Sequence, residues 1–257
     1  MAVQPREEGN RLYAQVARTL AARIAEGVYP LGGRLPSERD IAASTGVSRP
    51  TVREAILALE LDGLVEVRTG SGVYVAALAP ARAQADTSGF GPFEILEARA
   101  LIEGETCALA ATLIDDAGVS ALAAMIDAME LENERDVERS EEIDRRFHLG
   151  IAEATQNSAL VAAVDSLWAA RDRSPQYRLL SDKVRRAGIK PRAGEHNAIL
   201  AALRQRNPHA ARNAMRDHLR RVIDSLLQAT ESEAVEQAIE QARATVAATR
   251  QRYSGIA

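Results

Sequence analysis

The chain has 257 residues, of which 46% are hydrophobic and 26% charged, an ordinary composition for a globular protein long enough to form two domains. No apolar run approaches the roughly 20 residues that cross a bilayer, and the N-terminal residues lack the apolar core of a signal peptide. These observations exclude a membrane protein and predict a cytoplasmic one. The formal net charge of −4 argues only weakly against a nucleic-acid partner, because DNA binding needs no more than a local basic face.

Two helices are expected at the start of the chain. The first is marked by apolar residues that recur every four positions: Leu12, Val16, Leu20 and Ile24. Ser37, followed by Asp40 three residues later, is a capping-box pattern that opens a short second helix, and Gly46 can end this helix in the left-handed conformation.

A third helix and a β-hairpin follow. Ser48 is the candidate N-cap of the third helix, and Pro50 falls in the first turn of that helix, where the missing N–H of proline removes no helical bond. Apolar and polar residues then alternate over 65–68 and 73–75, on either side of a loop that contains glycine. Three helices followed by a hairpin predict a winged helix-turn-helix over residues 1–77.

The rest of the chain is predicted to be helical. Residues 78–91 are rich in Ala, Pro, Gly and small polar residues and are interpreted as a linker. We therefore expect a mainly α protein, with an all-α antiparallel helical bundle over 92–230 and a C-terminal helical extension over 231–257. Helix boundaries are expected at Asp115, Ser140, Asn157-Ser158, Pro175, residues 188–191 and Asn207-Pro208.

Arginines on the third helix indicate that the partner is DNA. The second helix of a helix-turn-helix lies in the major groove, with its N-terminal residues nearest the base edges. Arg49 and Arg53 are four residues apart and share one face, and Ser48 and Thr51 can donate to phosphate. The alternative is a surface helix with ordinary solvated arginines. With one residue of the preceding helix and two of the wing, the candidate DNA-binding residues are Arg39, Ser48, Arg49, Thr51, Arg53, Arg68 and Gly70.

The run RLPSERDIAASTGVSRPTVREAILALELDGLVEVRTGSGVYV resembles the winged-helix signature of the GntR family of transcription regulators. The resemblance covers about residues 11–76 with almost no gaps. It implies that the candidates above, apart from Arg68, contact double-stranded operator DNA. It also implies a homodimer that binds a short palindrome, as a two-fold protein requires.

The single cysteine, Cys107, lies in an apolar helical stretch. One cysteine excludes an intrachain disulfide framework and fits a reducing compartment. Its surroundings favour a buried structural thiol over a reactive one.

Three of the four histidines lie on apolar helical faces in the C-terminal half. Asp144 and His148 share one face of one helix, whereas His196 and His218 lie on two further helices. His209 faces the side opposite His218 and is expected to face solvent. Buried imidazoles need partners, so Asp144, His148, His196 and His218 either form hydrogen bonds in the core or bind a divalent metal ion. Zinc is expected first, although nickel, manganese and iron also suit these ligand types.

The segments FEILEARALIEGE, IDRRFHLGIAEATQN and GEHNAILAALRQRNPHAARNAMRDHL resemble the FCD domain of the FadR branch of GntR regulators. The resemblance implies that the same Asp and three His bind the metal, and it argues against an acyl-CoA effector. It also implies that Arg99 binds the carboxylate of the effector. Independently, Arg99 lies on an apolar stripe where a guanidinium needs an anion, which Glu103 could supply instead. Asn157 is a second effector-binding candidate, unless it only caps a helix.

Together these features predict a regulator, expected to be a repressor, whose operator affinity is controlled by a small organic acid bound at a divalent metal site. The wing motif resembles regulators of hexuronate and related sugar-acid genes most, so a sugar acid or hydroxy acid is expected. In one alternative the metal itself is the signal. In another the metal activates water for an enzyme, but no general base is evident beside the ligands, and we expect no enzymatic activity.

Overall fold

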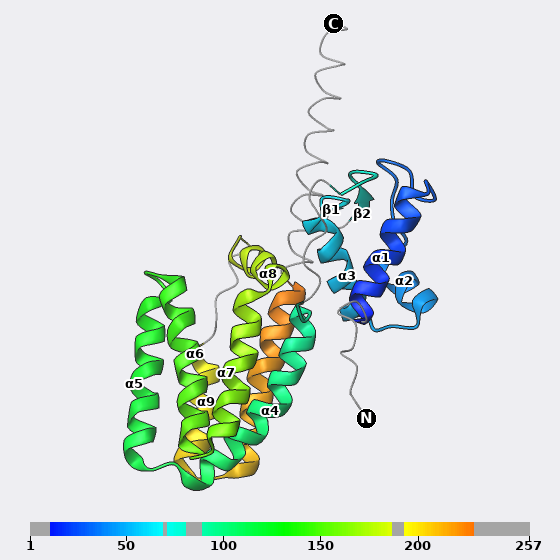
Figure 1. The fold of residues 1–257 in the computed structure, drawn as a ribbon. Coiled ribbons are helices and arrows are strands. Elements are labelled where there is room, and N and C mark those ends of the chain that lie inside the picture. The colour runs from blue at the N-terminus through cyan, green and yellow to red at the C-terminus, as the bar shows by residue number, and fades with distance from the viewer. Residues whose placement is uncertain (1–10, 69–70, 81–88, 187–192, 229–257) are drawn as a thin grey trace, which may run out of the picture. The chain divides into compact units, whose positions relative to one another are not determined.

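The computed structural model describes residues 11–68, 71–80, 89–186 and 193–228. These residues are mainly helical, with one two-stranded sheet (Figure 1), so the predicted fold class is confirmed. The chain divides into two compact units: the first comprises the described residues up to Gly91 with 178–183 and 227–228, and the second comprises the described residues of 92–177 and 184–226. Within the described ranges, no helix is both long and apolar enough to cross a membrane.

The N-terminal unit has the predicted three helices and a hairpin. The strands pair antiparallel, with Val65 opposite Val75. One apolar core joins the helices to the hairpin, and Ile24 and Val52 within it are completely buried. The elements are α1 (Leu12–Ala25), α2 (Glu38–Thr45), α3 (Arg49–Leu61), β1 (Val65–Arg68) and β2 (Gly72–Val75).

Capping side chains begin α2 and α3 where the sequence predicts. Ser37 accepts a hydrogen bond from the backbone N–H of Asp40, and Ser48 accepts one from that of Thr51. Gly46 ends α2 at φ 72°, a left-handed conformation that glycine adopts without steric cost. The turn between the two helices is therefore set by local hydrogen bonds.

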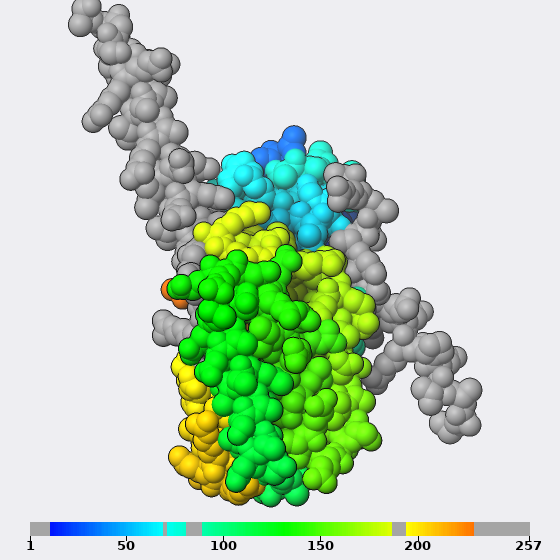
Figure 2. Space-filling model, turned by 90° about the vertical axis from the view of Figure 1, so that its left-hand side faces the viewer, coloured from blue at the N-terminus to red at the C-terminus, as the bar shows by residue number. Residues whose placement is uncertain are grey.

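The second unit is an all-α bundle. Helix α6 packs against α4, α5 and α7, and α9 packs against α4 and α5. Figure 2 shows the face of this unit that α5 covers. The helices after the linker are α4 (Pro92–Leu113), α5 (Asp116–Glu132), α6 (Val137–Ala154), α7 (Ser158–Arg173), α8 (Pro175–Arg186), α9 (Ala193–Arg204) and a last described helix over 208–228.

Three of the expected boundaries are helix N-caps. Asp115 accepts from the backbone N–H of Gly118 at 2.7 Å, and Asn207 accepts from that of Ala210 at 3.0 Å. Asn157 caps α7 in the same way. Side-chain caps of this kind are visible in the sequence because the chemistry is local.

The boundary expected at Ser140 is wrong. Helix α6 begins at Val137, because the carboxylate of Asp136 accepts the backbone N–H of Arg139 at 3.0 Å. Ser140 is buried within α6, and its hydroxyl donates to the carbonyl of Met129 at 3.3 Å. Its hydroxyl therefore joins α6 to α5.

Some predictions fall outside the described residues. They are the break at 188–191, the wing residue Gly70, the whole extension over 231–257 and the centre of the linker over 78–91.

Candidate functional site

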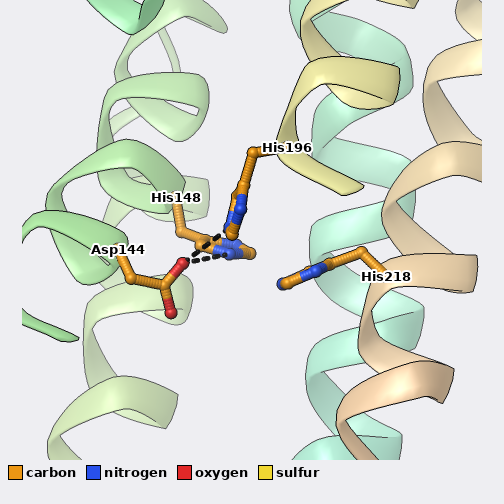
Figure 3. Close-up of side chains that lie close together, drawn as sticks. All are labelled: Asp144, His148, His196 and His218. Carbon is orange, nitrogen blue, oxygen red and sulfur yellow. Dashed lines mark hydrogen bonds and ion pairs between the residues drawn. The ribbon is translucent and has the colours of Figure 1, made fainter. Parts of the chain in front are cut away.

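Four predicted ligands meet inside the helical unit. Helix α6 carries Asp144 and His148, α9 carries His196, and the helix over 208–228 carries His218 (Figure 3). One ligand atom from each side chain lies within 4.8 Å of all the others. The three imidazoles are buried, and Asp144 is partly exposed. Positions that are far apart in the sequence therefore form one compact group of a carboxylate and three imidazoles.

Asp144 joins the group internally. Its Oδ1 lies 2.9 Å from Nε2 of His196 and 3.4 Å from Nε2 of His148, the two contacts drawn in Figure 3. The edge of Phe147 packs on His196, with ring centroids 5.1 Å apart. These contacts hold the Asp144 carboxylate beside two of the three imidazoles.

Two further carboxylates bind the outer nitrogens of the histidines. Nδ1 of His148 pairs with Glu103 on α4, and Nδ1 of His218 lies 3.0 Å from Glu195 Oε2 on α9. In His148 and His218, Nε2 is therefore the ring nitrogen that these two carboxylates leave unbound. A carboxylate behind the imidazole orients the ring and raises its basicity, as in many metal sites.

The residues present fit a divalent metal. Nε2 of His148 is buried and lies 3.4 Å from Asp144 Oδ1, but it forms no hydrogen bond with any residue that the structure describes. An unsatisfied buried nitrogen is costly, and a metal ion would satisfy it. The core-histidine alternative requires hydrogen bonds for every imidazole nitrogen, and this nitrogen lacks one.

Charge in the site is distributed unevenly. Burial lowers the pKa of His148, but the neighbouring carboxylates outweigh it and the pKa is raised. For His218, burial and repulsion by the other two histidines outweigh the bond to Glu195, and the pKa falls to about 4. Burial raises the pKa of Asp144, but its contacts with two histidines hold it well below its usual value. Neutral His218 and ionised Asp144 are in the forms that bind metals.

Substitution of Glu195 by Gln tests the outer carboxylate. Gln keeps the shape of the side chain but loses its charge, so we expect zinc affinity to fall about 10- to 100-fold. Glu105→Gln is the matched control, because it removes the same charge from an exposed ion pair with Arg212. Competition with a chelating dye measures both affinities. If the two variants bind zinc with equal affinity, Glu195 does not support metal binding.

Arg99 is buried beside the histidines, at 2% exposure. Its Nε donates to Glu103 Oε1 at 2.6 Å, and its guanidinium carbon lies 3.9 Å from the centroid of the Trp168 ring. Glu103 therefore supplies an anion to Arg99, which is the alternative to an effector carboxylate that the sequence left open. Among the described residues, however, Arg99 Nη2 has no hydrogen-bond partner. One guanidinium nitrogen is therefore available for a further acceptor.

Asn157 lies at the surface and caps α7. Its Oδ1 accepts from the backbone N–H groups of Ala159 at 3.0 Å and Leu160 at 3.3 Å. Any contact with an effector would have to use its amide nitrogen.

Two residues outside the group behave as the sequence predicts. His209 is exposed on the last described helix. Cys107 is buried, and burial, with a contribution from Glu103, raises the pKa of its thiol to about 12.

In the N-terminal unit, two candidate arginines extend into solvent. The side chain of Arg39 is 85% exposed and that of Arg49 is 61% exposed. Arg49 is the first residue of α3, where Ser48 and Thr51 also lie, with hydroxyl oxygens 2.8 Å apart. This is the end of the recognition helix that reaches base edges in helix-turn-helix proteins.

Arg53 and Arg68 have partners within the chain. Arg53 is only 12% exposed, and its Nε donates to both carboxylate oxygens of Glu38, at 2.9 and 2.8 Å. Arg68 pairs with Glu66 at 3.0 Å and lies over the ring of Tyr74. Glu38, which no sequence pattern indicated, also lies 3.6 Å from Arg49 and links α2 to α3.

Comparisons with known proteins match both units. Residues 12–75 match the model of bacterial regulatory proteins of the gntR family, and residues 94–221 match the model of the FCD domain.

Curated relatives match most of the chain. An Exu regulon transcriptional regulator of Escherichia coli strain K12 is 41% identical over 217 residues, which are 82% of this chain and 83% of the relative. A Uxu operon regulator of Haemophilus influenzae is 36% identical over 87% of this chain and 85% of its own length. A Uxu operon transcriptional regulator of Escherichia coli strain K12 is 38% identical, with 85% and 88% covered.

Proposed function

The chain belongs to the GntR family of bacterial regulatory proteins, whose matching members are transcriptional regulators and not enzymes, and from that premise we propose that it represses sugar-acid genes. A small organic acid, a sugar acid or hydroxy acid, binds at the metal site and releases the operator. The names of the Exu and Uxu relatives support this class of regulated gene. The protein acts in the cytoplasm as a homodimer on a palindromic operator, because two-fold proteins read two-fold sites.

The exposed end of α3 reads the operator. Arg49 and Arg39 have the solvent exposure that a contact with base edges or phosphate requires. Arg53, whose Nε donates to Glu38, is also a proposed DNA contact, although its side chain is less exposed than those of Arg39 and Arg49. The remaining proposed contacts are Ser48, Thr51, Arg68 and Gly70.

The proposal that the helical unit binds an acid at a metal ion depends most on one observation. Nε2 of His148 is buried and forms no hydrogen bond within the described residues. Asp144, His148, His196 and His218 would hold a divalent metal, with zinc as the first expectation. The bound metal supplies Lewis-acid positions for oxygen atoms of the acid. Arg99 Nη2 would donate a hydrogen bond to the carboxylate, and Asn157 is a further proposed contact.

Calorimetry on the zinc-loaded and the chelator-stripped protein tests this function. The ligands are six-carbon sugar acids and short hydroxy acids. We expect at least one acid to bind the zinc-loaded protein and to bind at least tenfold more weakly after stripping. If no acid binds, or if binding is indifferent to zinc, the proposal that an acid binds at the metal ion is wrong.

A further inference from the structure

Buried nitrogens that lack a hydrogen-bond partner among the described residues gather around Trp168, a completely buried residue of α7. In the part of the chain that the structure describes, six buried side-chain nitrogens have no hydrogen-bond partner. Four of them belong to Trp168 and to three side chains in contact with its ring: Trp168 Nε1, Arg99 Nη2, His148 Nε2 and Arg171 Nε. Unsatisfied buried polar groups are rare in folded proteins, so this clustering calls for an explanation.

The neighbours are close enough to Trp168 to line one site with it. The guanidinium carbons of Arg99 and Arg171 lie 3.9 and 4.8 Å from the centroid of its ring. The ring of His148, a proposed metal ligand, has its centroid 5.3 Å away. A molecule bound at the metal would therefore be next to the indole.

The chemistry of these nitrogens selects the ligand. A metal ion accounts for His148 Nε2, and the other three nitrogens are N–H donors on groups that cannot accept. The adjacent carboxylates are already used: Glu103 pairs with Arg99 and His148, and Glu141 accepts from Arg171 at 3.0 Å. Oxygen acceptors on a bound ligand would satisfy these three donors.

We propose that Trp168 determines effector specificity by donating its indole N–H to an oxygen of the acid that lies beyond the group facing the metal. Arg99 Nη2 and Arg171 Nε donate beside it. This inference rests on the proposed function, and it narrows the effector to an acid with oxygens along its chain, such as a six-carbon sugar acid. A two-carbon hydroxy acid, whose oxygens all belong to the group that faces the metal, would leave the indole N–H without a partner.

The chain contains one tryptophan, so its indole N–H gives a single signal in a ¹⁵N–¹H spectrum. We would titrate the zinc-loaded full-length protein with D-glucuronate, D-galacturonate, D-gluconate and glycolate. The indole proton should move downfield with a sugar acid, along the same saturation curve as the calorimetric heat, and should stay in place with glycolate.

The outcomes separate the two proposals. A sugar acid that binds calorimetrically without moving the indole signal overturns the role of Trp168 and leaves the proposed function standing. If none of the acids binds, the proposed function fails, and this inference fails with it.

Trp168→Phe removes the donor and keeps an aromatic ring for Arg99 to stack on. We expect the ratio of sugar-acid to glycolate affinity to fall about tenfold, with zinc and operator affinities unchanged. Val161→Ala is the matched packing control, because it removes an apolar contact with the cluster that contains Trp168 but no donor. That variant should keep the affinity ratio. An unchanged ratio in Trp168→Phe, with a wild-type melting temperature, contradicts the proposal.

Discussion

Replacement of His218 by Ala is expected to lower zinc affinity more than about 100-fold, beyond the effect of losing an outer-shell partner. His218 is one of three imidazoles in the group of four ligand atoms within 4.8 Å. His209→Ala is the internal control, because His209 lies on the same helix but is exposed. It should bind zinc as the wild type does.

Chelator competition measures both affinities, and thermal unfolding gives a second readout. A ligand at 100 times its dissociation constant stabilises the folded state by about 2.7 kcal/mol, so zinc should raise the melting temperature of wild type and His209→Ala. It should not raise that of His218→Ala. If His218→Ala binds zinc like the control, the metal is held elsewhere.

Replacement of Arg49 by Ala is expected to weaken operator binding about tenfold or more for each half-site, and about 100-fold or more for a dimer. An arginine that pairs with guanine is worth about 1–3 kcal/mol of discrimination, and a two-fold protein presents it twice. Arg49 has the position for this role, at the exposed start of α3.

Arg220→Ala is the control for Arg49→Ala. Its side chain is 68% exposed, close to the 61% of Arg49, but it belongs to the helical unit. Fluorescence anisotropy, with a duplex selected from a randomised pool, measures both variants at one salt concentration. Equal losses would mean that only overall charge matters, and the assignment of α3 as the reading helix would fail.

Sequence reasoning succeeded where the determining interactions are local. Ser37 and Ser48 bind backbone N–H groups three residues away, so the winged helix could be read from their spacing. Asp144 and His148 share a face because they are four residues apart. His196 and His218 could be added because each lies on the apolar stripe of a helix.

Interactions between distant segments could not be read in this way. No spacing links Glu38 on α2 to Arg53 on α3, although their pairing decides how far that arginine is exposed. Glu195 gives no signal as the partner of His218, and Trp168 looks like any core aromatic until Arg99 is found stacked on it. These contacts depend on helix packing, which one sequence does not specify.

The error at Ser140 has a related cause. Ser and Asp are both good N-caps, and the sequence offers Asp136 and Ser140 within one turn of each other. The choice depends on what lies behind the helix. The hydroxyl of Ser140 binds the carbonyl of Met129 on α5, and that bond belongs to tertiary packing.

The central claim is that an acid acts on the operator through the metal. It is tested most directly by measuring operator affinity under four conditions, with and without zinc and with and without the bound sugar acid. The account predicts that the acid weakens operator binding about 5- to 150-fold in the zinc-loaded protein and has no effect on the stripped protein. An equal shift by zinc alone would make the metal the signal, and an acid effect that survives stripping would contradict the account.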